Sequence, residues 1–130
     1  DELLYSTGLT NPDLARMLND LIPERAEIVA DSAEPKSIEE LHRFGFLIKP
    51  SKKGPDSVRM GIDVMKRHKL HATPRSHNLI KELRNYKWKT DKNERQLNQP
   101  VDDHNHTIDA IRYVCLNKLT KSHSGTYHIR

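Results

Sequence analysis

The sequence contains only one cysteine, Cys115, so no disulfide can form within the chain and no zinc site can be built from several thiolates. No apolar run approaches the roughly 18 residues that span a bilayer, and no signal peptide is recognisable. No phosphate-binding loop of the form G-x-x-x-x-G-K-[ST] occurs, which excludes an ATPase domain of that type. We therefore expect an intracellular protein that does not enter a membrane. The chain also lacks an initiator methionine, so we expect it to be a piece of a longer protein.

Apolar residues are scarce, at 35% of the 130 residues, whereas 31% are charged. This balance predicts a single domain, residues 1–130, with a large wet surface. Twenty-two Lys and Arg face eighteen Asp and Glu, for a net charge of +4. The excess suits an anionic partner such as nucleic acid, and an ordinary solvated surface explains it equally well. The basic residues gather near 49–53, 59–69 and 87–92, where together they could contact a DNA backbone.

Short β-rich runs alternate with helical periodicity, which is typical of an α/β domain with a largely parallel sheet. We expect polar residues 90–100 to form a loop or an exposed hairpin, and residues 121–130 to be a flexible tail. The pattern predicts strands at 3–5, 26–31, 46–48 and 69–73, and a further strand-like segment at 87–89. It predicts helices over 12–21, 37–45 and 101–113, and two more that begin at 55–57 and at 74–76.

Asp31 is the last residue of the clearest predicted strand, 26–31. In open parallel sheets, functional groups gather where strands end at their carboxyl termini. Asp31 is therefore a candidate for chemistry, although a loop-capping role explains an aspartate there without any chemistry.

The stretch 101–113 holds five metal- or proton-competent side chains within eight residues. Helical spacing would place Asp102, His106, Asp109 and Tyr113 on one stripe, opposite an apolar stripe that runs from Ile108 to Leu119. Acids at a helix N-terminus are favoured by the helix dipole, which accounts for Asp102 without chemistry but not for Asp109 in mid-helix.

His106 and Asp109, three residues apart, can meet one ion or one phosphate. Carboxylates suit Mg²⁺ and Mn²⁺, and carboxylates from separate elements that hold two such ions are the usual arrangement for metal-assisted phosphodiester cleavage. The histidine could orient water, ligate the metal or protonate the leaving oxygen. The remaining histidines are scattered, and their spacing does not predict a zinc site.

Three segments resemble the C-terminal nuclease domain of phage terminase large subunits, as found in tailed phages and defective prophages. They read DELLYSTGLTN at 1–11, ADSAEPKSI at 30–38 and DHNHTIDAIRY at 103–113. The resemblance implies an RNase H-like mixed sheet flanked by helices, and a metal-dependent endonuclease using Mg²⁺ or Mn²⁺. It assigns Asp31, His106 and Asp109 as catalytic and metal-binding residues.

In that family the domain cuts concatemeric double-stranded phage DNA during packaging. The intact protein works with a small subunit and a portal, in the cytoplasm of an infected or lysogenic host. The family's first catalytic aspartate lies on a strand that precedes the start of this chain, and Asp1 does not replace it. We therefore expect an incomplete metal site and impaired cleavage.

The missing first strands would also expose one edge of the strand 26–31, whose unpaired backbone groups could then pair with another strand. We expect residues 3–5 or a second chain to pair with that edge. Two other functions stay open: a non-catalytic prophage remnant that binds DNA or a packaging partner, and a resolvase on the same fold. Residues 7–11 favour a terminase over a resolvase.

Overall fold

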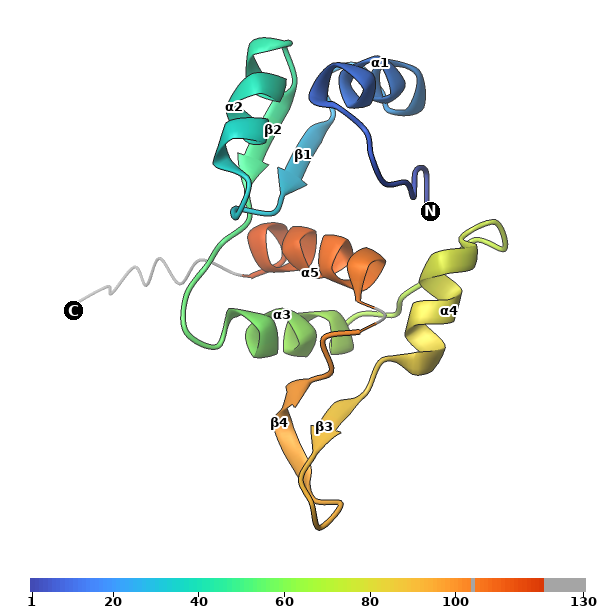
Figure 1. The fold of residues 1–130 in the computed structure, drawn as a ribbon, viewed down its shortest axis with the longest axis vertical. Helices are drawn as coiled ribbons and strands as arrows, with labels where there is room; N and C mark the ends of the chain where they lie inside the picture. The colour runs from blue at the N-terminus through green and yellow to red at the C-terminus, as the bar shows by residue number, and fades with distance from the viewer. Residues whose placement is uncertain (104, 121–130) are drawn as a thin grey trace, which may run out of the picture.

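The computed structural model describes residues 1–103 and 105–120, so the expected flexible tail lies outside the described residues. Five helices and four short strands make up this part of the chain (Figure 1). In order they are α1 (Asn11–Leu21), β1 (Glu27–Ala30), α2 (Pro35–Arg43), β2 (Leu47–Pro50), α3 (Ser57–Lys66), α4 (His77–Asn85), β3 (Trp88–Thr90), β4 (Gln96–Pro100) and α5 (His106–Lys118).

The strands form two separate two-stranded sheets. β1 and β2 are parallel, with Ile28 opposite Ile48, and they lie beside α1 and α2 in one half of the molecule (Figure 1). β3 and β4 form an antiparallel hairpin that projects from the other half, which confirms the hairpin alternative for residues 90–100. The expected α/β class is therefore correct, but the described strands do not join into one sheet.

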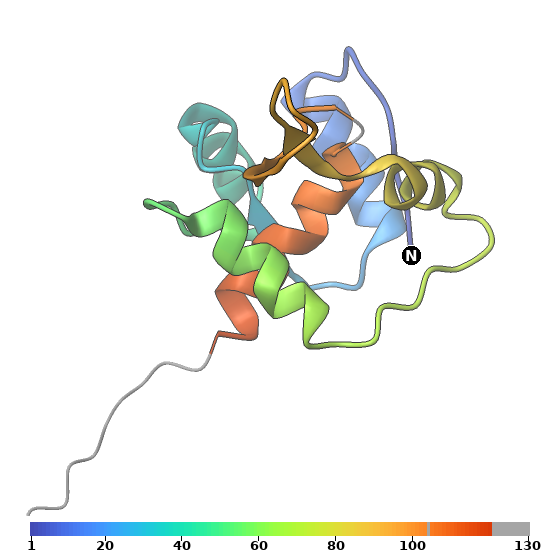
Figure 2. The same cartoon turned by 90° about the horizontal axis from the view of Figure 1, so that it is seen from below.

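The last helix, α5, joins the two halves. It packs against α3, α4 and β1, and it lies alongside α3 in both views (Figures 1 and 2). One core cluster, Ala15, Leu41 and Ile48, fills the space among α1, α2 and β2. The other surrounds Ile108, which is 2% exposed, and includes residues of α3, α4 and α5. Any group on α5 is therefore placed relative to both halves.

Local capping explains where α1 begins. Thr10 caps α1 through a capping box with Asp13, and Pro12 lies in the first turn. The helix predicted over 37–45 begins two residues earlier, at Pro35, and ends at Arg43. Ser37 and Glu40 accept hydrogen bonds from the Asn11 amide, at 3.3 and 2.8 Å, which ties α2 to α1.

Two of the predicted strands do not form. Residues 69–73 have no strand partner, and Leu70 is largely exposed, because one large apolar side chain gives this run little to bury. Residues 3–5 are not a strand and do not pair with β1. β1 thus has a strand neighbour on one side only within 1–103 and 105–120.

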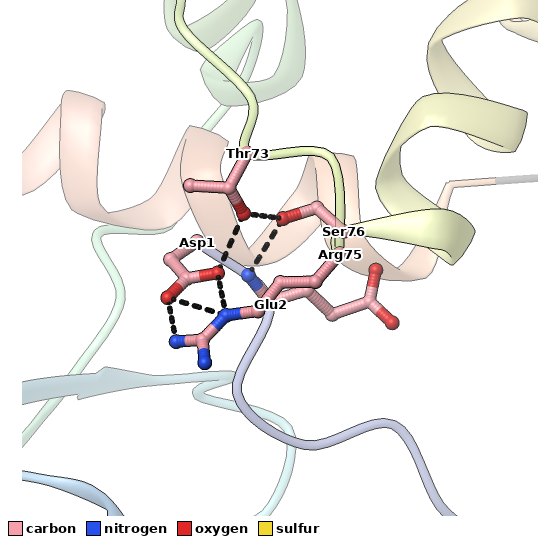
Figure 3. A network of polar contacts seen from close by, with 5 residues as sticks. All are labelled: Asp1, Glu2, Thr73, Arg75 and Ser76. Carbon is pink, nitrogen blue, oxygen red and sulfur yellow. Dashed lines mark hydrogen bonds and ion pairs between the residues drawn. The ribbon is translucent and has the colours of Figure 1, made fainter.

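Polar contacts hold the first residues elsewhere. The Glu2 backbone N–H donates to Ser76 Oγ at 3.0 Å, and Asp1 pairs with Arg75 and accepts from Thr73 (Figure 3). The Glu2 carboxylate accepts from the Leu79 backbone N–H at 2.8 Å, in the first turn of α4. This capping of α4 draws the amino-terminal segment away from the β1 edge.

The helix predicted over 101–113 begins later, at His106. The Val101 N–H still donates to the Lys87 carbonyl, which continues the hairpin pairing. Asp102 pairs with Lys89 at 3.0 Å, before the helix. The predicted stripe from Asp102 to Tyr113 is therefore wrong at its first member, while His106, Asp109 and Tyr113 do lie on α5. The expected mid-helix position of Asp109 is also wrong, because Asp109 lies in the first turn of α5, where the helix dipole favours an acid. Within the described residues, no helix is long and apolar enough to cross a bilayer.

Candidate metal centre

Asp31 follows β1 directly, at the edge where both parallel strands end. Its side chain is exposed, and Oδ1 accepts the Ala33 backbone N–H at 2.9 Å. The Ser51 N–H donates to the Ala30 carbonyl at 2.7 Å, so the chain after β2 is fastened to the chain after β1. Asp31 therefore takes a loop-capping role and still presents its carboxylate at the predicted edge.

The charges of Asp31 and Asp109 both influence the pKa of Tyr113 on α5. Burial raises the pKa of the Tyr113 hydroxyl most strongly above 10.0, and the charges of Asp109 and Asp31 raise it further. Arg112 opposes them, and a side-chain hydrogen bond with Asp31 adds to the rise. Two of the three predicted site residues, from different elements, thus contribute negative charge near one phenol.

The Asp109 side chain is half-buried on α5. Arg112 Nε donates to Oδ1 of Asp109 at 3.1 Å, and Arg112 Nη2 forms an ion pair with the same oxygen, also at 3.1 Å. Within the described part of the chain, Oδ2 accepts no hydrogen bond. Asp109 therefore has one oxygen engaged and one available.

His106 is exposed at the first position of α5, one turn before Asp109. Its ring meets the Tyr5 ring edge-on, with centroids 6.4 Å apart. A cavity of about 370 Å³ lies beside this pair, between residues 4–7 and the first turns of α5. His106 thus borders open space, and neither Asp31 nor Asp109 lines that cavity.

Within residues 1–103 and 105–120, no three histidine, cysteine or carboxylate side chains are grouped closely enough to hold a metal ion. Asp31 and Asp109 nevertheless supply the hard oxygen donors that Mg²⁺ and Mn²⁺ prefer. The donor chemistry of these two carboxylates therefore suits such an ion.

Sequence reasoning missed two buried charged residues, Arg112 and Glu82. Arg112 is on the buried face of α5 and Glu82 is 3% exposed on α4. A signal for Arg112 was present in the sequence, since an arginine amid the apolar positions of a helix needs a nearby acid, and Asp109 lies three residues before it. Nothing local identifies Glu82, because its partners are 25 and 26 residues away.

The fold of this chain matches that of a solved nuclease domain. The crystal structure of the g2p (large terminase) nuclease domain from bacteriophage SPP1, which contains bound Mn, matches with a TM-score of 0.66 and 36% sequence identity. The match covers 81% of this chain and 62% of that one. The expected RNase H-like fold class is therefore confirmed.

The family model described as "Terminase RNAseH like domain" matches residues 1–116, so this chain belongs to the terminase RNase H-like family. It is 40% identical over 103 residues to the terminase large subunit of Bacillus phage SPP1, covering 75% of this chain and 24% of that protein. It is 33% identical over 110 residues to the PBSX phage terminase large subunit of Bacillus subtilis (strain 168), covering 84% and 25%. The chain thus spans about a quarter of the length of these relatives.

Proposed function

We propose that this chain is a nuclease domain of a phage terminase large subunit, which cuts concatemeric double-stranded DNA during packaging with the help of Mg²⁺ or Mn²⁺. The observation that carries the proposal is the packing of α5, which carries His106 and Asp109, against β1, which leads directly into Asp31. The family membership and the Mn-containing relative support it.

In this proposal Asp31 and Asp109 hold a divalent cation, and His106 is a further ligand or transfers a proton. The bound ion would lower the pKa of an attacking water and offset charge on the scissile phosphate. His106 suits proton transfer because its ring is exposed beside a cavity and imidazole is the side chain that most often transfers protons in enzymes.

A basic loop lies close to these residues and suits a DNA backbone. The Lys52 N–H donates to Asn117 Oδ1 at 2.9 Å, and Asn117 lies one helical turn after Tyr113. Lys52 and Lys53 are exposed on this loop. Two cations beside the carboxylates would attract phosphates on either side of a cut.

The intact large subunit would act with a small subunit and a portal, in the cytoplasm of the phage's bacterial host. The described residues group no three metal-competent side chains. We therefore expect the 130-residue chain to bind Mn²⁺ weakly and to nick DNA poorly.

Plasmid nicking in Mn²⁺ tests the function. Asp31→Asn and Asp109→Asn should each abolish the residual nicking and weaken Mn²⁺ binding. Asp20→Asn, at an exposed acid on α1, is the matched control and should change neither. Vigorous cleavage by the unaltered chain would show that two carboxylates and His106 suffice. Nicking that survives both substitutions would refute the proposed site.

The alternative is a non-catalytic module that binds DNA or a packaging partner. It is favoured by one observation, namely that the described residues contain no group of three metal-competent side chains. Undetectable Mn²⁺ binding, with salt-sensitive DNA binding retained, would support this alternative. The third possibility, a resolvase, is not favoured, because the chain belongs to the terminase family.

A further inference from the structure

Arg112 is buried to an extent that arginine reaches only when it is paired. Its side chain is 6% exposed, on the side of α5 that packs against α3. Asp109 is the acid that compensates its charge, and the Tyr113 ring lies 4.7 Å from the guanidinium carbon. A buried charge without such a partner would be strongly unfavourable, so Arg112 must keep its ion pair with Asp109.

The stem of Arg112 occupies space that only glycine leaves free. A Cβ atom added to Gly61 on α3 would lie 2.4 Å from Arg112 Cγ and 3.0 Å from Cδ. Glycine in a helix interior is unfavourable relative to alanine, and Gly61 does not have a positive φ that would require it. The close approach of Arg112 is therefore the reason for glycine at this position.

The geometry divides the two oxygens of Asp109. Both guanidinium donors contact Oδ1, so the carboxylate is held from one side. Oδ2 accepts no hydrogen bond from residues 1–103 or 105–120, and the side chain is 25% exposed. A carboxylate held in this way is oriented for a second contact through its other oxygen.

We propose that Arg112 is a positioning residue for metal binding, which holds Asp109 through Oδ1 and leaves Oδ2 for a divalent cation, with Gly61 providing the space for the arginine stem. This inference rests on the proposed function, in which Asp109 is a metal ligand. Outer residues that orient a metal ligand typically contribute 10- to 100-fold in metal affinity.

The sign of the effect separates orientation from charge. Removing a cation from the neighbourhood of a metal site would by itself strengthen Mn²⁺ binding. Loss of orientation would weaken it. The proposal requires that orientation dominates.

Mn²⁺ titration of the 130-residue chain, followed by the electron paramagnetic resonance of free Mn²⁺, provides the test. Arg112→Met keeps an unbranched stem beside Gly61 and removes the guanidinium. It should weaken Mn²⁺ binding about 10- to 100-fold, and Arg112→Lys should weaken it less. Arg16→Met is the matched control, because Arg16 forms an exposed i,i+3 pair with Asp13, and should leave the affinity unchanged.

Gly61→Ala tests the packing of the Arg112 stem against Gly61 without altering any charge. This substitution should weaken Mn²⁺ binding in the unaltered background, and should have no effect on binding once Arg112→Ala has removed the stem. Thermal unfolding checks that each variant folds. If Arg112→Met does not fold, Arg112→Lys and this cycle decide the matter.

The outcomes distinguish the two levels of inference. Absence of Mn²⁺ binding, or affinity unchanged by Asp109→Asn, would overturn the proposed function and this inference with it. Affinity lowered by Asp109→Asn but unchanged or raised by Arg112→Met would overturn the positioning role alone. Loss of affinity in Arg112→Met and Gly61→Ala together, with Arg16→Met unchanged, would support it.

Discussion

Glu82 on α4 caps the beginning of α5 by accepting hydrogen bonds from both the backbone N–H and the hydroxyl of Thr107, at 2.8 and 2.5 Å. The same oxygen accepts the Ile108 N–H at 3.1 Å. The residue at the usual capping position, Asn105, provides no side-chain cap. A buried carboxylate from another helix therefore satisfies backbone donors that a local side chain normally satisfies.

Glu82→Ala should lower the free energy of unfolding by about 2–4 kcal/mol, because it leaves buried N–H groups of α5 without an acceptor. Glu82→Gln should cost less, since an amide oxygen can still accept. Urea denaturation measures both, and Glu39→Ala on the exposed face of α2 is the control, expected within about 0.5 kcal/mol of the unaltered chain. A cost for Glu82→Ala no larger than that of the control would show that α5 does not depend on this cap.

Gly61→Ala should destabilise the fold, although alanine normally stabilises a helix interior by about 1 kcal/mol over glycine. The reason is the overlap of the new Cβ with the Arg112 stem, and overpacking of this kind costs about 1–3 kcal/mol. In the Arg112→Ala background the overlap disappears, so the same substitution should become stabilising. Thermal unfolding of the four proteins measures this reversal, and stabilisation in both backgrounds would contradict the close packing.

Stability should fall on acidification partly through Glu2. Burial alone would raise the pKa of its carboxyl, but hydrogen bonds from Asn78 and from the Leu79 backbone outweigh it and lower the pKa below 4.5. Because the folded-state pKa is depressed, this contribution is present above the unfolded-state pKa. It is lost as pH falls through the folded-state pKa.

Urea denaturation between pH 6 and about pH 3 should therefore show a smaller acid-induced loss of stability in Glu2→Gln than in the unaltered chain. Asn78→Ala keeps the carboxyl and removes one donor, and should move the pKa of Glu2 back toward its usual value in NMR titrations. Identical pH dependence of Glu2→Gln and the unaltered chain would refute the capping of α4 by this carboxylate.

The alkaline titration of Tyr113 reports directly on the two carboxylates. In chelator-treated protein, Asp31→Asn and Asp109→Asn should each lower the pKa of Tyr113, since loss of a neighbouring negative charge favours the phenolate. The charge of Asp109 also raises the pKa of Tyr86. Ultraviolet difference spectra against Tyr113→Phe are therefore needed to isolate the titration of Tyr113. A Tyr113 titration unaffected by Asp31→Asn would separate Asp31 from the candidate site.

The unpaired edge of β1 should allow a second chain to add a strand. Residues 3–5 do not cover it, and unpaired strand edges favour association. Light scattering after size-exclusion chromatography should show concentration-dependent dimers, and amide exchange in β1 should slow as dimers form. A strictly monomeric chain at all concentrations would contradict this.

Local pattern was sufficient for the parts of the fold that local interactions determine. The β-branched run before Asp31 and the periodicity around Asp109 predicted β1 and α5, and with them two residues of the candidate site. The start of α5 was placed too early because hairpin pairing at Val101 and the Glu82 cap come from distant residues. The partners of Glu2 and the close packing of Gly61 with Arg112 were invisible for the same reason.

The two carboxylate caps make the candidate site dependent on contacts between residues that are far apart in the sequence. Glu2 stabilises the first turn of α4 across a separation of 77 residues, and α4 carries the Glu82 that stabilises the first turn of α5. Contacts between residues so far apart close slowly, because long loops must be ordered first. We therefore expect the turn before Asp109 to become ordered no sooner than the packing of α4 against α5, on which its Glu82 cap depends.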